Sequence, residues 1–186
     1  MHVHLKGRSP CSHLSEQQLY NNLSPRIHGV CITDHWVLKP IKYMLEYDFA
    51  VFFGVELTCN SGDILAYGIK RLPSKGLRAS QVINFIHEQG GIAACAHPFS
   101  GRHFALGEAV YDHDFDAIEI NGSIGRKAND EAERAANVMG IPTIGGSDSH
   151  SIHHLNTVAT HFNDDVHNFS DILEAIKKSE CKAVNI

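Results

Sequence analysis

The sequence predicts an α/β fold and, within that class, a small distorted TIM-like barrel of seven parallel strands, a (β/α)7 arrangement built as one domain over residues 1–186. Short apolar runs alternate with helical patterns, which is typical of parallel sheets. Polar side chains of metal-binding type follow the ends of six apolar runs, and a barrel gathers its strand ends at one face. A chain of 186 residues is short for eight strands, which favours seven.

Local signals define the elements in the first half of the chain. A capping box begins a helix at Ser15, and Ser24-Pro25 ends it. The turn NSGD at residues 60–63 joins two strands in a hairpin-like pair. A second helix is expected over residues 40–47. The expected strands of this half cover residues 2–5, 29–33, 50–58 and 64–69.

The second half repeats the alternation with clearer helical periodicity. Val82, Ile83 and Ile86 share one face of an amphipathic helix that Gly90-Gly91 ends. The expected helices cover residues 79–89, 127–139 and 170–178. The expected strands cover residues 92–96, 115–120, 141–144, 157–162 and 183–186.

Composition excludes several classes of protein. The 21 acidic and 16 basic residues give a net charge of −5, which argues against stable nucleic-acid binding but permits a nucleotide substrate. No apolar run is long enough to span a membrane, and the first residues lack the apolar core of a signal peptide. The 5 cysteines form no CxxC pair, so we expect a reducing, cytoplasmic setting. The 14 histidines make metal binding the first hypothesis to examine.

Three motifs carry that hypothesis. His2 and His4 project to the same side of a strand because side chains alternate along it. Glu56 lies in the apolar run FFGVELT, where an unpaired charge is costly and no basic residue is near in sequence. Asp148 and His150 follow a Gly-Gly strand end. Each motif alone also fits an incidental strand histidine or a polar turn, but together they indicate a polynuclear metal site.

The ordered set HVHLKGRSPCS, ITDH, GVEL, AHP and GGSDSH resembles the PHP family, named for polymerase and histidinol phosphatase. The resemblance implies a distorted (β/α)7 barrel and a metal-dependent phosphoesterase with two or three divalent metal ions, which are zinc, manganese or iron. The ligands that it implies are His2, His4, Glu56 and Asp148 for the first metal, Glu56, Asp63 and His97 for the second, and His35 and His150 for the third.

The chain departs from the family pattern at three positions. Asp63 stands where the family often has a histidine. A carboxylate is a harder ligand than an imidazole, so this exchange would favour manganese or iron at the site. Met1 stands where an aspartate usually precedes the first histidine, so a group that orients this ring must come from elsewhere. Ser9 stands where a third-metal ligand is usual, with Cys11 and His13 as the nearby substitutes.

The predicted reaction is hydrolysis of a phosphoester in a small phosphorylated metabolite or nucleotide, by a hydroxide shared between the metals. Asp148 or His150 would protonate the leaving group or orient the water. Arg102 would clamp the phosphate by charge, and His103 and Asn121 would complete the substrate contacts.

Other functions stay open from the sequence. The same resemblance admits a histidinol-phosphate phosphatase and a 3′-exonuclease module. Asp63 and Ser9 keep open a non-catalytic metal-binding regulatory protein. Metal-dependent C–N hydrolysis is less favoured, because Glu56 already fills the bridging role that a lysine-type ligand has in barrel amidohydrolases. The oligomeric state is not predicted.

Overall fold

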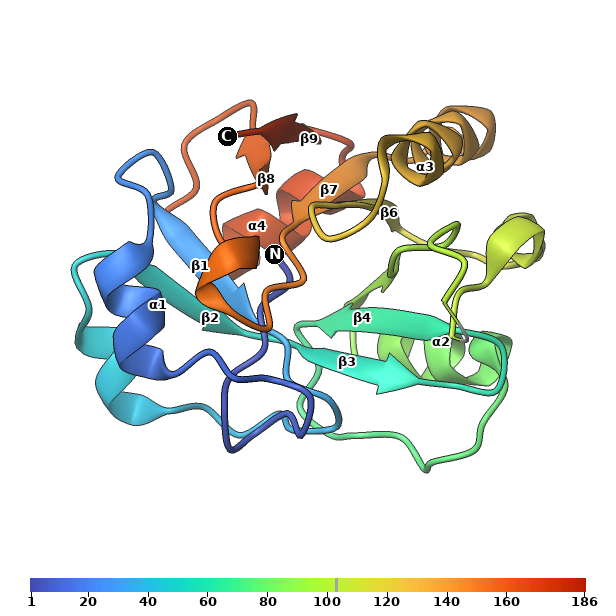
Figure 1. Ribbon diagram of the computed structural model, residues 1–186. Helices are drawn as coiled ribbons and strands as arrows, with labels where there is room; N and C mark the ends of the chain where they lie inside the picture. The colour runs from blue at the N-terminus through green and yellow to red at the C-terminus, as the bar shows by residue number, and fades with distance from the viewer. Residues whose placement is uncertain (103) are drawn as a thin grey trace.

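The structure is a computed structural model that describes residues 1–102 and 104–186. In this part of the chain, nine strands alternate with four α-helices and three short 3-10 helices (Figure 1). The strands are β1 (Gly29–Ile32), β2 (Ala50–Phe53), β3 (Val55–Thr58), β4 (Asp63–Tyr67), β5 (Ile92–Cys95), β6 (Ala117–Asn121), β7 (Thr143–Gly146), β8 (Val158–Phe162) and β9 (Cys181–Asn185). The α-helices are α1 (Glu16–Asn22), α2 (Ala79–His87), α3 (Arg126–Met139) and α4 (Phe169–Lys177). The 3-10 helices are η1 (Lys42–Glu46), η2 (Gly107–Asp112) and η3 (Ile152–His154).

The strands form three separate sheets, and within the described residues none of them closes into a barrel. The central sheet has the order β3-β4-β5-β6-β7, and the other two sheets are the pairs β1-β2 and β8-β9. Neighbours from β5 to β7 are parallel, whereas β3-β4, β4-β5 and β8-β9 are antiparallel. The fold is mixed α/β, and the predicted TIM-like (β/α)7 barrel is wrong.

The barrel fails where the sequence suggested one long strand over residues 50–58. The chain divides at Gly54, so that β2 pairs with β1 in parallel while β3 forms a hairpin with β4. A Cβ atom on Gly54 would lie 2.7 Å from Cδ1 of Tyr67, so glycine permits this close approach. A cavity of about 560 Å³ is lined by residues of both small sheets, among them Val30 and Phe52 of β1-β2 and Val158 and Phe162 of β8.

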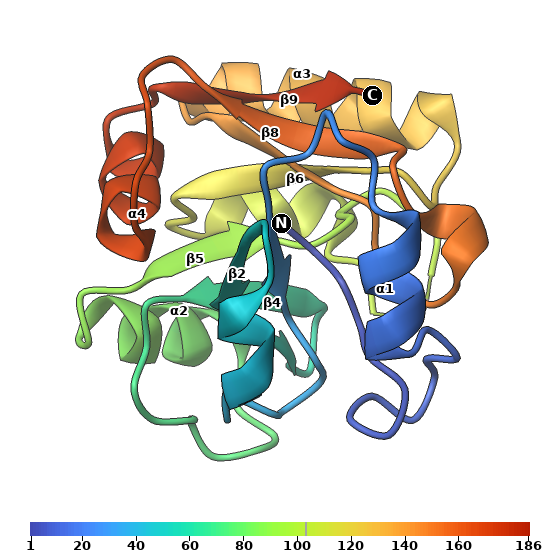
Figure 2. The ribbon, with the colours of Figure 1, turned by 90° about the vertical axis from the view of Figure 1, so that its left-hand side faces the viewer.

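The helices cover the two faces of the central sheet because its side chains alternate. Ile64 and Ala66 of β4 belong to one apolar core together with residues of α2 and α3, while Leu65 and Tyr67 belong to a second core with residues of α4. Figure 2 shows α4 and α1 on opposite sides of the molecule. None of the helices in residues 1–102 and 104–186 is long and apolar enough to cross a membrane.

Local signals explain the helix ends. The predicted capping box of α1 is confirmed, since the Ser15 hydroxyl accepts a hydrogen bond from the backbone N–H of Gln18, and the Gln18 side chain accepts one from the backbone N–H of Ser15. Asn168 caps α4 in the same way. Gly140 ends α3 in the left-handed conformation, with φ of 69°.

Candidate metal centre

The predicted site residues meet where the parallel strands of the central sheet end. His97 follows β5, Asn121 closes β6 and Asp148 follows β7, and Glu119 of β6, which was not among the predicted residues, joins them. Glu56 lies in β3. Because parallel strands end at a common edge, the polar residues that follow them come together there.

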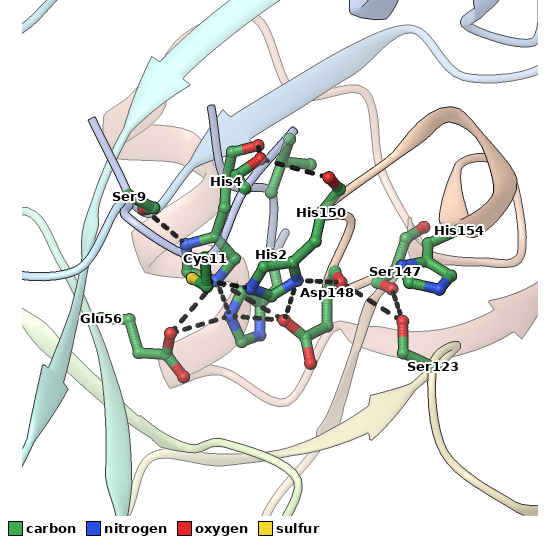
Figure 3. Close-up of polar contacts among 12 residues, drawn as sticks. His2, His4, Ser9, Cys11, Glu56, Ser123, Ser147, Asp148, His150 and His154 are labelled. Atoms are coloured by element: carbon green, nitrogen blue, oxygen red, sulfur yellow. Dashed lines mark hydrogen bonds and ion pairs between the residues drawn. The ribbon is translucent and has the colours of Figure 1, made fainter. Parts of the chain in front are cut away.

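The segment that carries His2 and His4 crosses this edge. Residues 2–5 form isolated bridges instead of the predicted strand, with Val3 pairing to Ile32 of β1 and to Ser149 after β7. The two imidazoles lie with Glu56 and Asp148 in Figure 3. One short segment therefore fastens β1 to the end of β7 and inserts two histidines between them.

Glu56 occupies the centre of the cluster. Its Oε2 atom lies 3.1 Å from His4 Nε2, 3.1 Å from His35 Nδ1 and 3.4 Å from His2 Nε2. Its Oε1 atom lies 3.3 Å from His97 Nε2 on the other side. One buried carboxylate thus presents one oxygen to each of two groups of side chains, which is the arrangement of a bridging ligand.

Three groups of side chains can each hold a metal ion. Within each group, one ligand atom per residue lies within 4.8 Å of the others. The groups are His2, His4 and Asp148; Glu56, Asp63 and His97; and His4, His35 and His150. The structure therefore brings together all eight residues predicted as metal ligands.

Unpartnered buried atoms support the fit of these groups to cations. Glu56 Oε2, Asp63 Oδ1 and His97 Nδ1 are buried and form no hydrogen bond with any described residue. The ring nitrogens of His2, His4 and His35 approach Glu56 Oε2 without hydrogen-bond geometry, so these atoms converge on a common region. Buried charges without partners are costly, and a bound cation relieves that cost.

The ring of His2 is oriented by Glu119, a residue with no role predicted from the sequence. Both residues are fully buried, and Glu119 Oε1 accepts a hydrogen bond of 2.7 Å from His2 Nδ1. Glu119 Oε2 accepts two further hydrogen bonds, from the His97 backbone N–H at 2.9 Å and from Asn121 Nδ2 at 3.0 Å. Glu119 thus supplies the orienting group that the sequence lacks before His2, and it turns His2 Nε2 toward the cluster.

Ser9 orients His4 in a comparable way. The Ser9 hydroxyl donates to Asp34 Oδ1 at 2.8 Å, so its oxygen accepts from His4 Nδ1 at 3.0 Å. Asp34 is fixed in turn by Arg8 Nε at 2.6 Å and by the Leu5 backbone N–H at 2.7 Å. Ser9, where the resemblance would place a metal ligand, therefore orients the ring of a predicted ligand, His4.

These two orienting contacts have a joint electrostatic consequence. The Nε2 atoms of His2 and His4 lie only 2.9 Å apart, and both carry lone pairs when their Nδ1 atoms donate. Burial lowers the pKa of His2, but Glu119, Glu56 and Asp148 outweigh burial and raise this pKa well above its usual value. The cluster therefore favours a positive charge at this point, from a proton or from a metal ion.

The two central carboxyl groups stay ionised. Burial raises the pKa of Glu56, but His2, His4 and His97 outweigh it and hold this pKa well below its usual range. The pKa of Asp148 is likewise lowered, by His2, His4 and Arg102 against burial. His97 and Asp148 also adopt left-handed backbone conformations, with φ of 29° and 47°. Such strain costs about 1–3 kcal/mol per residue and is typical of functional sites.

Glu119 gives the first testable prediction. In Glu119→Gln, the amide oxygen can still accept from His2, but the NH2 group cannot accept from the His97 N–H or from Asn121 Nδ2. We therefore expect metal affinity to fall by about 10- to 100-fold or more, together with some loss of stability. Competition against a chromophoric chelator measures this change. Glu133→Gln on the exposed face of α3 is the matched control. Equal affinities of the Glu119 variant and the wild type would contradict the orienting role.

The buried Asp63 carboxyl group leads to a prediction of how the stability of the fold changes with pH. Burial and the charge of Glu56 raise the pKa of Asp63 from 3.8 to about 6. A raised pKa in the folded state means that the contribution of Asp63 to stability is full below pH 4 and is lost as the pH rises through 6. In chelator-treated protein at pH 8, Asp63→Asn should therefore be more stable than wild type by up to about 3 kcal/mol, with the gain vanishing near pH 4.

Urea unfolding of the two chelator-treated proteins across this pH range measures the difference. Asp114→Asn, at an exposed position, is the control and should show no such pH dependence. Parallel pH profiles for wild type and Asp63→Asn would show that Asp63 is not a buried ionised group.

Of the residues predicted to contact substrate, one lies at the rim of the site and another is buried within it. Arg102 lies at the rim, with its side chain 42% exposed and Nη1 donating to Asp148 Oδ2 at 2.5 Å. Asn121 is fully buried and its amide bonds to Glu119 and to the Ser123 backbone N–H. Contact of Asn121 with substrate stays a prediction. His103 lies outside the described residues.

His150 and Cys11 meet at the outer side of the cluster. His150 Nδ1 donates to the Asp148 carbonyl at 2.9 Å, and its Nε2 lies 3.1 Å from Cys11 Sγ. Burial and the nearby His4 lower the pKa of His150, and burial raises the pKa of the Cys11 thiol. His150 is therefore neutral near pH 7, the state in which an imidazole binds metal.

Part of the chain matches a known family model, and part of it is similar to a protein of another organism. Residues 126–181 match a family model described as PHP-associated. An uncharacterized protein of Methanocaldococcus jannaschii is 34% identical over 98 residues, which cover 50% of this chain and 57% of that protein. The match thus spans little more than half the length of this relative.

The fold has a counterpart among solved structures. The crystal structure of PsfC from Pseudomonas syringae superimposes with a TM-score of 0.65 at 16% identity, over 86% of this chain and 77% of PsfC. An identity this low shows likeness of fold alone. The PHP-associated match includes Asp148 and His150, whereas the motifs from His2 to His97 lie outside it. The comparisons thus relate the C-terminal part of the chain to the PHP family.

Proposed function

We propose that the protein is a metal-dependent phosphoesterase that hydrolyses a small phosphorylated metabolite or nucleotide. The observation that carries the proposal is the buried Glu56 carboxylate, with one oxygen toward His2, His4 and His35 and the other toward His97. A carboxylate that serves two groups of ligands at once is typical of centres with two adjacent metals. When bound, two divalent ions supply an activated water and offset the charge that develops on phosphate oxygens.

The residues of the chain have separable tasks in this reaction. His2 and His4 would bind metal through Nε2, because Glu119 and Ser9 accept hydrogen bonds from their Nδ1 atoms. Glu56 balances the charge of the bound cations from the centre of the site. The donor set mixes imidazole with carboxylate, which suits zinc, manganese or iron.

Asp148 and His150 are predicted to move protons, but their contacts favour a different task. Asp148 Oδ2 is occupied by Arg102, and the His150 Nδ1 proton is held by the Asp148 carbonyl. Both side chains are therefore better placed as ligands than as proton donors. Proton transfer by either residue stays a prediction, which an Asn variant with unchanged metal content and an intact rate would contradict.

Arg102 is the best-placed group to bind phosphate. Its guanidinium has five N–H donors, of which one reaches Asp148, and its partial exposure places it at the rim. We expect Arg102→Ala to lower kcat/KM for a phosphomonoester by about 10- to 100-fold, since a hydrogen bond to a charged group contributes about 1.5–3 kcal/mol. Metal content should be unchanged, and Arg126→Ala on α3 is the control for loss of one positive charge. An unchanged kcat/KM would exclude a phosphate clamp.

The experiment that tests the function combines metal analysis with turnover. Protein purified without chelator or added metal is assayed for bound metal, and the same sample is tested with p-nitrophenyl phosphate and with the p-nitrophenyl ester of thymidine monophosphate. The proposal expects two or more metals per chain and hydrolysis stimulated by manganese. Preference for the diester would direct the search to nucleotides and strand ends. Bound metal without turnover on either ester, after reconstitution, would favour the non-catalytic metal-binding alternative.

A further inference from the structure

We propose that the cavity between the sheet β1-β2 and the sheet β8-β9 is a second binding site, which takes an aliphatic monocarboxylate and is separate from the metal centre. The cavity has a volume of about 560 Å³, and its wall includes residues of both sheets together with Met1 and Ile186. Figure 2 faces this side of the molecule and shows the N-terminus between β2 and β8. The inference does not depend on the proposed phosphoesterase activity.

The body of the cavity is apolar. Its wall includes Val30 and Phe52 of the sheet β1-β2, Val158 and Phe162 of β8, and Ile172 of α4. An apolar cavity of about 150 Å³ holds a molecule the size of benzene, so the larger volume here has room for a ligand of roughly ten to twenty carbon atoms. Apolar walls of this kind favour an aliphatic group over a polar one, because that group leaves water when it enters.

The uncharged polar side chains in the wall are already bonded to the protein. The Ser147 hydroxyl donates to the Val158 carbonyl at 3.3 Å, and the Thr160 hydroxyl donates to the Gly145 carbonyl at 3.2 Å. The amide oxygen and the amide nitrogen of Asn156 each bond to a backbone group of the segment before β1. These groups therefore offer little to a water molecule, which needs two to four polar partners, or to a polar ligand.

Arg26 provides a positive charge at the mouth of the cavity. This exposed residue lines the cavity, and its guanidinium forms no hydrogen bond or ion pair with a described residue. His28 lines the cavity two positions further along the chain. A guanidinium is always charged and binds a carboxylate with two parallel hydrogen bonds. An unpaired guanidinium beside an apolar cavity therefore fits an anion that carries an apolar chain.

Two acidic residues of the wall make a cationic ligand the alternative. Asp164 and Asp165 line the cavity from the segment after β8, and within the described residues no ion pair joins either of them to Arg26. Glu174 most strongly, and then Glu180 and Asp164, raise the pKa of the Lys178 ammonium. Asp164 thus lies near a cation of the protein itself, whereas Arg26 has no anionic partner. This difference favours an anionic ligand.

The cavity and the metal centre lie on opposite sides of the same segments. Val3 lines the cavity, whereas His2 and His4 on either side of it point to the cluster, because side chains alternate along an extended segment. Ser147 lines the cavity, and the next residue, Asp148, belongs to the metal centre. The residues that line the cavity include none of the predicted metal ligands. A ligand in the cavity therefore contacts the backs of two metal-binding segments and leaves the metal centre itself open.

Isothermal titration calorimetry with straight-chain carboxylates tests the site in the full-length protein, both as purified and after treatment with chelator. We expect one decanoate per chain in both preparations, because Arg26 binds the carboxylate and a metal does not. Each methylene group added between hexanoate and decanoate should tighten binding about threefold to fourfold, which is the contribution of one buried CH₂ group. All ligands are used below the concentration at which they form micelles.

Two variants locate the ligand in the cavity. Arg26→Glu should weaken decanoate binding by about tenfold or more, because it replaces attraction by repulsion at an exposed position. The same change should strengthen the binding of decyltrimethylammonium. Ala50→Phe, which enlarges an exposed side chain of the wall, should also weaken decanoate binding, with circular dichroism as the check on the fold. Arg126→Glu on the exposed face of α3 is the matched control and should change neither affinity.

Three results would overturn the inference. Tighter binding of decyltrimethylammonium than of decanoate by the wild type would assign the cavity to a cation held by Asp164 and Asp165. Equal affinities for hexanoate and decanoate would mean that surface charge alone binds the carboxylate. Binding that disappears after treatment with chelator would place the carboxylate on the metals. Each of these results leaves the proposed phosphoesterase activity untouched, since that activity is measured with phosphoesters on the metal-loaded protein.

Discussion

Glu56→Gln is expected to remove metal from both sides of the centre and to lower phosphoesterase turnover by about 10³-fold or more. The Glu56 carboxylate lies within 3.4 Å of ring nitrogens of His2, His4, His35 and His97, so its loss affects both groups of ligands. Metals contribute several kcal/mol of charge stabilisation in phosphoryl transfer, and each 1.4 kcal/mol or so is tenfold in rate. Glutamine has the same shape, so packing of β3 should be preserved.

Metal analysis and turnover on the same samples measure the effect, and circular dichroism checks the fold. The Glu133→Gln variant is again the control, because its side chain lies on the outer face of α3. If Glu56→Gln retained both its metal and its rate, Glu56 would not bridge two metals.

Gly146→Ala is expected to be strongly destabilising, because it adds a methyl group between two buried side chains of the metal centre. A Cβ atom at this position would lie 2.2 Å from Glu119 Oε1 and 2.6 Å from His2 Cβ. Both neighbours are fully buried and bonded to each other, so neither side chain is free to move away. Overpacking of this kind costs about 3 kcal/mol, which lowers Tm by roughly 10 °C for a chain of this size.

The substitution should also weaken metal binding, because it separates His2 from the carboxylate that orients it. Thermal unfolding and metal analysis measure the two effects. Gly125→Ala is the matched control, since Gly125 has φ of −69° and no atom within 4 Å of a Cβ placed there. A Gly146→Ala protein with the Tm of the wild type would mean that His2 and Glu119 are less tightly packed than described.

The strand ends were the most predictable part of the molecule, and the sheet connections were the least. Polar residues after β5 and β7 signalled a common edge because that edge follows from local strand order alone. The division of one apolar run at Gly54 could not be predicted from the sequence, because both halves have the same hydrophobic pattern. They differ only in the strands with which they pair: β2 pairs with β1, and β3 pairs with β4. The sequence therefore indicated which ends converge but not that three sheets carry them.

The ligands of the site were predictable, but the groups that orient them were not. His2 and His4 are recognised by their spacing on one face of an extended segment. Glu119 orients His2 from 117 residues away, and no local pattern marks such a pair. Ser9 was interpreted as a lost ligand, whereas its hydroxyl connects His4 to Asp34. Sequence spacing detects residues that share an element, and it does not detect partners that only the fold brings together.

The insertion of residues 2–5 between β1 and the end of β7 has a consequence for how the chain acquires its structure. Val3 bridges to Ser149, and the Ser12 side chain reaches the His150 carbonyl across 138 positions. Contacts of such sequence separation form late, because the loop between them must close first. During synthesis, His2 and His4 therefore emerge long before Glu119 and Asp148 exist to receive them. Complete ligation of the centre therefore requires that the chain has been synthesised past residue 150.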